Sequence, residues 1–231
     1  IDGGVDFVTT ANNHIMDCYE AGETSTYDTL EAYGIPFGKE GQAQLYTTDS
    51  GLVIGIYCSG KDLAPNKTKA LNAIQQLIDD GAEYIICAFH WGQELYYEPN
   101  QAQIDLAHAC IDAGADLIYG SHTHCLQPIE EYGGGIIFYS LGNFVSTQQK
   151  LEELLGGMAK FTIQKTVQDG KTSIEILTPT VEPLVMHYNS DAGEFGPYML
   201  SDYTEELASQ NGVQSLSLIH ISEPTRHSLI S

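Results

Sequence analysis

The chain has 231 residues, of which 42% are hydrophobic and 17% charged, enough for one large globular domain or at most two small ones. Its formal net charge is -22, from 31 Asp and Glu against 9 Lys and Arg, which argues against a nucleic-acid partner. No run of about 18 apolar residues occurs, so we predict no transmembrane helix.

The cysteines and the acidity constrain the chemistry only loosely. The five cysteines form no CxxC pair, and we interpret them as small buried hydrophobic residues that do not indicate a compartment. An acidic surface also repels anionic substrates. A site that handles phosphate would therefore need bound cations to reverse the local field.

Both ends of the sequence look atypical. The chain begins at Ile1 and enters an apolar run at once, so we expect it to be incomplete at the N-terminus. At the other end, Leu216 to Arg226 reads LSLIHISEPTR, which matches a translated transposase sequencing adapter. We expect residues 216–231 to be a cloning or assembly artefact that contributes nothing to the fold, and residues 201–215 to be a C-terminal segment of unassigned role.

The first part of the chain alternates strand and helix patterns. In chain order we expect strand Val5–Thr9, helix Thr26–Tyr33 after an N-cap at Ser25, strand Gly51–Cys58, a helix from Asn66 to Gly81, strand Tyr84–Phe89, helix Gln101–Ala113 and strand Leu117–Tyr119.

The pattern changes after Gly133, where only strands are expected. These are Ile136–Ser140, Ala159–Thr166 and Ser173–Leu177, with a hairpin turn at Asp169–Gly170 before the last. A βαβ half followed by an antiparallel half predicts one α/β domain of layered sheets over residues 1–200.

Three of the expected strands are followed by polar side chains suited to a site. Asn13 and His14 follow the first, His90 follows the strand at Tyr84–Phe89, and His122 and His124 follow the strand at Leu117–Tyr119. Ligand sites of parallel α/β sheets lie beyond the carboxyl ends of the strands. Because imidazole binds divalent metals such as Zn, Mn and Fe, we expect Asn13, His90, His122 and His124 to converge on a metal site.

Four motifs in order carry a family resemblance. They are ANNH at Ala11–His14, HWGQE at His90–Glu94, GSHTH at Gly120–His124 and YSLGNF at Tyr139–Phe144. Over roughly residues 4–185 the chain resembles the calcineurin-like metallophosphoesterases, in particular the bacterial capsule-synthesis family (CapA, poly-γ-glutamate biosynthesis). The resemblance implies a layered αββα sandwich, incomplete here at its N-terminus.

The resemblance also implies residue roles. Asn13 would be a metal ligand and His14 a general acid or charge stabiliser near the phosphate. His90 and His122 would complete one metal and His124 would bind the other, with two divalent ions in the full-length parent. The family's Asp and Glu ligands would precede Asn13, and nothing before Val5 matches them. We therefore expect this chain to bind at most one metal tightly and to hydrolyse phosphoesters weakly or not at all.

Three neighbouring residues leave alternatives open. Asp17 and Glu94 would orient histidines or simply cap loops, and Trp91 would line a cleft or pack, with packing favoured. Asn143 in the SLGNF motif is interpreted as a turn former.

Two functions fit these patterns. The first is a metal-dependent, phosphoesterase-like hydrolase of the cell envelope, acting on an anionic polymer or phosphoester and working with capsule-synthesis membrane proteins. The second is a non-hydrolytic component of capsule assembly or export that binds polymer or partner proteins. An intracellular nucleotidase is disfavoured because no basic residue accompanies the motifs.

Overall fold

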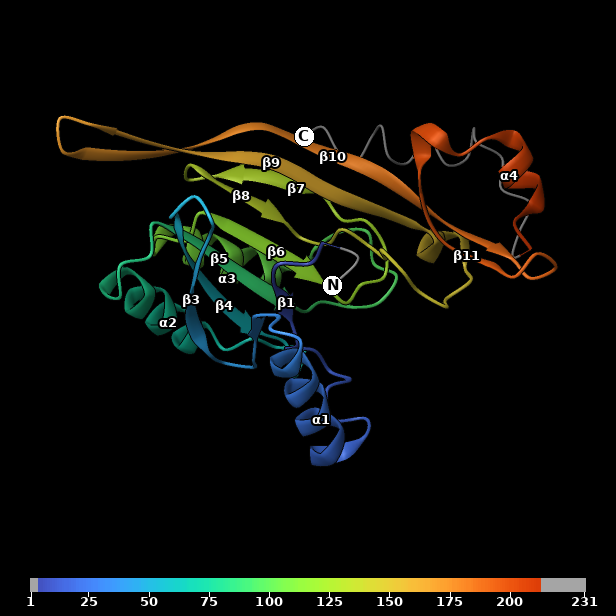
Figure 1. Cartoon of the computed structure of the whole chain (residues 1–231), viewed down its shortest axis with the longest axis horizontal. Coiled ribbons are helices and arrows are strands. Elements are labelled where there is room, and N and C mark those ends of the chain that lie inside the picture. Colours follow the sequence, from blue (N-terminus) through green and yellow to red (C-terminus); the bar gives the residue numbers. More distant parts are fainter. Residues whose placement is uncertain (1–3, 213–231) are drawn as a thin grey trace. The chain divides into compact units, whose positions relative to one another are not determined.

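A computed structural model describes residues 4–212, so the predicted artefact at 216–231 lies outside the described residues. The chain forms two compact units (Figure 1). Of the described residues, the first unit contains 4–92, 100–120 and 131–137, and the second contains 93–99, 121–130 and 138–212. The fold is mixed α/β, with a larger sheet flanked by helices and a smaller antiparallel sheet, as the sequence predicts.

A six-stranded sheet forms the centre of the first unit. Its order is β3 (Ala43–Thr47), β4 (Val53–Ser59), β5 (Tyr84–His90), β6 (Leu117–Ser121), β8 (Gly135–Phe138) and β7 (Ile129–Tyr132). The terminal residues of three of its strands, β6, β7 and β8, belong to the second unit. Strands β4 and β5 are parallel and β3 is antiparallel to β4. The apolar β4 and β5 runs are largely buried along their length, as expected of central strands in a sheet.

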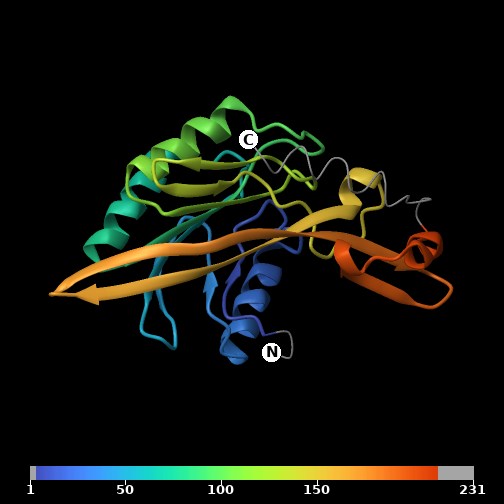
Figure 2. The same cartoon turned by 90° about the horizontal axis from the view of Figure 1, so that it is seen from above.

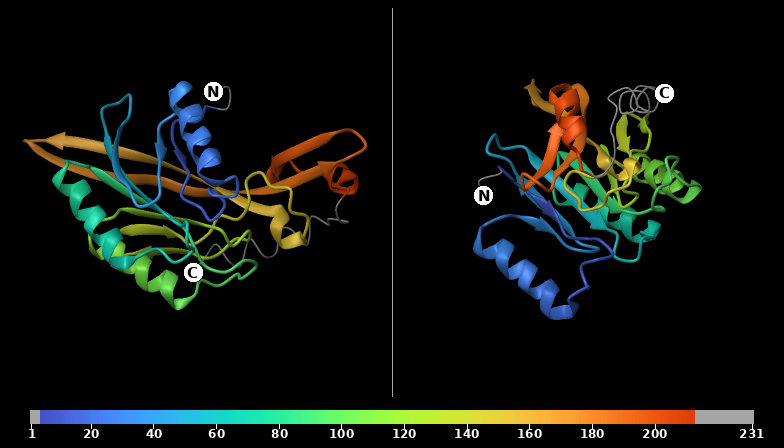
Figure 3. Two further views of the ribbon diagram at one scale, coloured as in Figure 1. Left: turned by 90° about the horizontal axis from the view of Figure 1, so that it is seen from below. Right: turned by 90° about the vertical axis from the view of Figure 1, so that its right-hand side faces the viewer.

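Two helices cover one face of this sheet and lie side by side (Figure 3). Helix α2 (Lys67–Asp79) begins where the Asn66 side chain accepts a hydrogen bond from the Lys69 amide, which confirms the predicted cap. Helix α3 (Gln101–Asp112) begins with a capping box between Asn100 and Gln103. Each helix buries one stripe of side chains. Helix α2 connects β4 to β5, and helix α3 connects β5 to β6.

The segment before β3 differs from its prediction. Strand β1 (Val8–Thr9) pairs in parallel with β2 (Phe37–Gly38). Helix α1 (Tyr19–Ala32) starts seven positions before the predicted Thr26, so the predicted cap at Ser25 is wrong. Thr26 and Thr29 instead donate their hydroxyls to carbonyls one turn earlier, which allows them to sit within a helix.

The second unit is built on a long antiparallel ribbon (Figure 2). Strand β9 (Leu155–Gln168) pairs with β10 (Lys171–Asn189), and β10 also pairs with β11 (Glu194–Met199). The predicted turn at Asp169–Gly170 is confirmed, and both residues have positive φ. The 3-10 helices η1 (Leu151–Leu154) and η2 (Leu200–Asp202) and helix α4 (Glu205–Gln210) close a small core around Leu154, Val185 and Tyr203.

Across residues 4–212, no helix is both long enough and apolar enough to cross a lipid bilayer. The five cysteines are free thiols, and all except Cys18 are buried, as their interpretation as hydrophobic residues predicts.

Candidate metal centre

Three side chains of the second unit form a group that could hold a metal ion. Glu94, His122 and His124 each offer one ligand atom, and these atoms all lie within 4.8 Å of one another. Glu94 comes four residues after β5 ends, while both histidines follow β6 directly. Two imidazoles and one carboxylate are the ligands that catalytic zinc sites use while keeping a coordination position open.

The histidine loop has an unusual backbone. His122 has a φ of 97° and His124 a φ of 58°, both in the left-handed region that residues other than glycine rarely adopt. Such strain costs about 1–3 kcal/mol per residue and clusters at functional sites. Both imidazoles contribute a ligand atom to the group with Glu94 despite this backbone.

Thr123 holds this loop in place between the two histidines. Its side chain is fully buried, and its hydroxyl donates to the Cys125 carbonyl at 2.9 Å. Its own carbonyl accepts a hydrogen bond from the Leu95 amide at 2.8 Å. Because Leu95 is next to Glu94, this bond fixes the carboxylate-bearing segment to the histidine-bearing loop.

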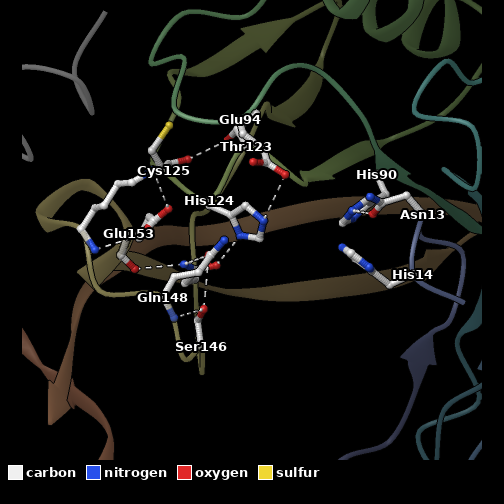
Figure 4. Close-up of polar contacts among 12 residues, drawn as sticks. Asn13, His14, His90, Glu94, Thr123, His124, Cys125, Ser146, Gln148 and Glu153 are labelled. Atoms are coloured by element: carbon white, nitrogen blue, oxygen red, sulfur yellow. Dashed lines mark hydrogen bonds and ion pairs between the residues drawn. The ribbon is translucent and has the colours of Figure 1, made fainter. Parts of the chain in front are cut away.

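His124 is held in one orientation by Asn143. Figure 4 shows the His124 imidazole facing Glu94. The Nδ1 atom of His124 lies 2.9 Å from the Asn143 Oδ1 atom, and its Nε2 atom lies 4.0 Å from a Glu94 carboxylate oxygen. The imidazole is three-quarters buried and Glu94 is half exposed. The cluster is therefore open to solvent on its carboxylate side, which gives an ion or a substrate a way in.

A second group lies in the first unit. The Nε2 atom of His90, at the end of β5, is 2.9 Å from the Oδ1 atom of Asn13. Beside Asn13, the His14 Nδ1 atom is 2.8 Å from an Asp17 carboxylate oxygen, and both side chains are about two-thirds exposed. Asp17 is therefore in contact with His14, and its orienting role remains a prediction.

Gly60 allows the close approach beneath His90. A Cβ atom at this position would overlap the His90 Cβ and lie 2.8 Å from its backbone nitrogen. The Glu40 carboxylate fixes this turn, since it accepts hydrogen bonds from the Ser59 hydroxyl and the Gly60 and Lys61 amides.

The predicted site residues thus fall into two groups, Asn13 with His14 and His90 in one unit, and His122 with His124 in the other. Glu94, predicted only as an orienting or capping residue, lies with the second group as a candidate ligand. Asn143 was expected to form a turn, and its contact with His124 was not predicted. Trp91 is 1% exposed and stacks on Phe89, as a packing role requires.

The comparison with protein families shows which family the chain belongs to. The family described as bacterial capsule synthesis protein PGA_cap matches residues 1–148, more than half of the chain. The chain belongs to this capsule synthesis family. The match spans all four motifs, so the resemblance seen in the sequence is confirmed.

Individual relatives carry related names. The PGA biosynthesis protein CapA of Bacillus subtilis is 42% identical over 105 residues, covering 45% of this chain and 28% of that protein. The capsule biosynthesis protein CapA of Bacillus anthracis is 33% identical over 174 residues, or 64% of this chain and 41% of that protein. A protein named probable polyglutamine synthesis accessory protein, from Mycobacterium tuberculosis, is 28% identical over 181 residues, or 65% of this chain and 47% of that protein.

The chain therefore matches less than half the length of each of these relatives. Among solved structures, a hypothetical protein from Thermus thermophilus is 15% identical with a TM-score of 0.48, covering 78% of this chain and 77% of that one. A similarity at this level supports no argument about function.

Proposed function

We propose that this capsule-synthesis chain is a divalent-metal-dependent hydrolase of the phosphoesterase type, which acts on an anionic polymer or phosphoester of the cell envelope. The observation that carries the proposal is the group of Glu94, His122 and His124, whose ligand atoms lie within 4.8 Å of one another. A bound divalent ion would also supply the positive field that a chain of net charge -22 lacks.

The residues present fit a divalent cation. Two imidazoles and a carboxylate suit Zn, Mn or Fe, and the donor set does not distinguish among them. The Asn143 contact leaves the His124 Nε2 atom facing Glu94, where a ligand atom is needed. When bound, such an ion would polarise a phosphoryl oxygen and lower the pKa of bound water. His14, held by Asp17, is the proposed proton donor to the leaving oxygen.

We further propose that Asn13 and His90 belong to the same centre. This rests on the motif order, because the family resemblance assigns Asn13, His90 and His122 to one metal. For the full-length parent we also propose a second ion and the layered αββα arrangement. We further propose an extracytoplasmic location and capsule-synthesis membrane proteins as partners. The single carboxylate in the cluster supports tight binding of one ion by this chain.

The alternative function is a non-hydrolytic component of capsule assembly that binds anionic polymer through its metal. The same single-carboxylate cluster favours it, because one ion can bridge the chain to a carboxylate polymer without activating water for attack. The two functions share the metal and differ only in turnover.

One experiment separates these possibilities. Zinc and manganese are titrated calorimetrically into the wild-type chain, Glu94→Gln and His122→Ala, with Glu175→Gln on the exposed part of β10 as the matched control. An aryl-phosphate assay uses the same samples. Tight binding that only the cluster variants lose, with turnover that disappears in parallel, supports the hydrolase. Binding without turnover supports the polymer-binding function only if the metal-loaded chain also retains poly-γ-glutamate and the cluster variants do not. Unchanged metal binding in both cluster variants would refute the metal centre.

A further inference from the structure

The side-chain amide of Asn143 has only one orientation that satisfies its neighbours. One of its terminal atoms lies 2.9 Å from the backbone carbonyl oxygen of Glu153 and 3.1 Å from the Gln148 Oε1 atom. A backbone carbonyl can only accept a hydrogen bond, so the atom facing it must be the amide nitrogen. The Oδ1 atom of Asn143 is therefore the one that faces His124.

This orientation determines the hydrogen position on His124. The Asn143 Oδ1 atom can only accept, and it lies 2.9 Å from the His124 Nδ1 atom, so Nδ1 must carry a hydrogen. In a neutral imidazole the lone pair then lies on Nε2. That atom is the one directed at Glu94, 4.0 Å away, where the metal cluster needs a ligand.

Gln148 and Glu153 hold the Asn143 amide, and further contacts surround these two residues. Figure 4 shows Ser146, Gln148 and Glu153 near His124. Gln148 accepts from Asn143 and is itself bonded to the Ser146 hydroxyl. The Tyr188 hydroxyl of β10 donates to the carbonyls of Ser146 and Gln148. On the backbone side, a Cβ atom at Gly156 would overlap the Asn143 carbonyl, so the start of β9 packs directly against this residue.

We propose that Asn143 is a positioning residue of the metal centre, which holds His124 as the Nδ1–H tautomer with Nε2 free to bind a divalent cation. The inference rests on the proposed function in taking His124 as a ligand. Groups that orient a metal-binding histidine through its second ring nitrogen affect affinity strongly, and their loss typically lowers it about 10–100-fold. Here the orienting group is an amide whose own geometry is fixed by a backbone carbonyl.

The test is the ring tautomer of His124 in the metal-free chain. Long-range proton–nitrogen NMR spectra of histidine-labelled protein at about pH 8, where imidazoles are neutral, distinguish Nδ1–H from Nε2–H. A His124→Gln variant assigns the signal. We compare wild type with Asn143→Ala, which removes the acceptor, and Asn143→Asp, which keeps an acceptor oxygen but loses the donor to Glu153 and Gln148. Tyr188→Phe is a control that loosens the loop without touching Asn143.

We expect Nδ1–H in wild type, Asn143→Asp and Tyr188→Phe, and loss of that preference in Asn143→Ala. Calorimetric zinc titration should show about 10–100-fold weaker binding in Asn143→Ala and near wild-type binding in Tyr188→Phe. A merely structural role would lower the melting temperatures of the Ala and Asp variants alike without separating their tautomers.

Two results would overturn the inference, an Nε2–H tautomer in wild type or an Asn143→Ala variant with unchanged tautomer and zinc affinity. The proposed function fails separately. If wild type binds no zinc while Asn143→Ala still loses the Nδ1–H form, the metal centre is refuted and Asn143 remains the residue that fixes the His124 ring.

Discussion

The Nε2 atom of His90 lies 2.9 Å from the Oδ1 atom of Asn13, although 77 positions separate these residues in the chain. The amide oxygen only accepts, so Nε2 carries the hydrogen in this contact. These are the two atoms that the family resemblance assigns to one metal. Binding an ion there would require the hydrogen to leave Nε2, which couples metal binding to proton movement.

The first prediction concerns whether this pair and the Glu94 cluster act as one centre. His90→Ala and His122→Ala are each expected to weaken zinc binding about tenfold or more, or about 1.4 kcal/mol. Because ligands of one ion depend on each other, the double variant should lose less than the sum of the single losses. Calorimetric titration of the three variants measures this. Strictly additive losses would place His90 outside the centre.

A second prediction concerns the glycine beneath His90. Gly60→Ala should destabilise the fold by about 1–3 kcal/mol, because the added Cβ would overlap the His90 side chain and press on its backbone. Gly196→Ala is the matched control, since a Cβ there meets nothing within 4 Å and the glycine lacks a positive φ. Urea unfolding of both variants gives the comparison. Equal free energies of unfolding for the two variants would show that the backbone at Gly60 shifts to accept the added Cβ atom without strain.

Metal should stabilise the folded chain. A ligand that binds only the folded state, at a concentration about 100-fold above its Kd, raises the unfolding free energy by about 2.7 kcal/mol. We therefore expect zinc to raise the melting temperature of wild type and EDTA to reverse it. His122→Ala should show neither effect. A rise of equal size in that variant would mean that zinc binds elsewhere.

The fourth prediction concerns pH. Burial lowers the pKa of His187 from its usual value of 6.5, and the Glu194 carboxylate opposes this only in part. The His187 Nδ1 atom lies 3.0 Å from the Tyr203 hydroxyl, which also accepts a hydrogen bond from Asn211. Below pH 6.5 the unfolded chain binds a proton that the folded chain resists, so stability should fall as the pH falls through the window beneath 6.5.

Urea unfolding at about pH 7.5 and 5.5 checks this, because the window opens just below the ordinary histidine pKa of about 6.5. The matched variant is His187→Asn, which removes the titrating ring and should lose less stability on acidification. The exposed His14 provides a control, since its replacement by Asn leaves the buried ring untouched. Equal acid sensitivity of wild type and His187→Asn would remove His187 as the cause.

Helix caps and tight turns could be predicted from the sequence because their signals are local. The Asn66 cap and the turn at Asp169–Gly170 each follow from one or two residues. The burial of α2 was harder to predict, because its buried face is lined by alanines as well as Ile74 and Leu77, while the apolar Ile78 is 42% exposed. Small residues contribute little to an apolar pattern, although they allow close packing.

Strand lengths in the second half could not be predicted. Strand β10 spans Lys171–Asn189, far beyond the predicted Ser173–Leu177, because pairing with β9 and β11 extends it past Pro179 and Pro183. Of the candidate site, the histidines were found through their motifs. The Asn143 contact depends on a loop that brings together residues 19 positions apart, and nothing in the local sequence around either residue signals it.

The positive φ angles of His122 and His124 place histidine at two positions whose backbone favours glycine. Glycine would adopt the same backbone at a lower conformational cost than histidine does. A family member that no longer needs the ion is therefore free to drift to Gly or Asn at these two positions and to gain stability as it does so. On the proposed function, members with Gly or Asn at both positions are expected to be the ones that bind no ion.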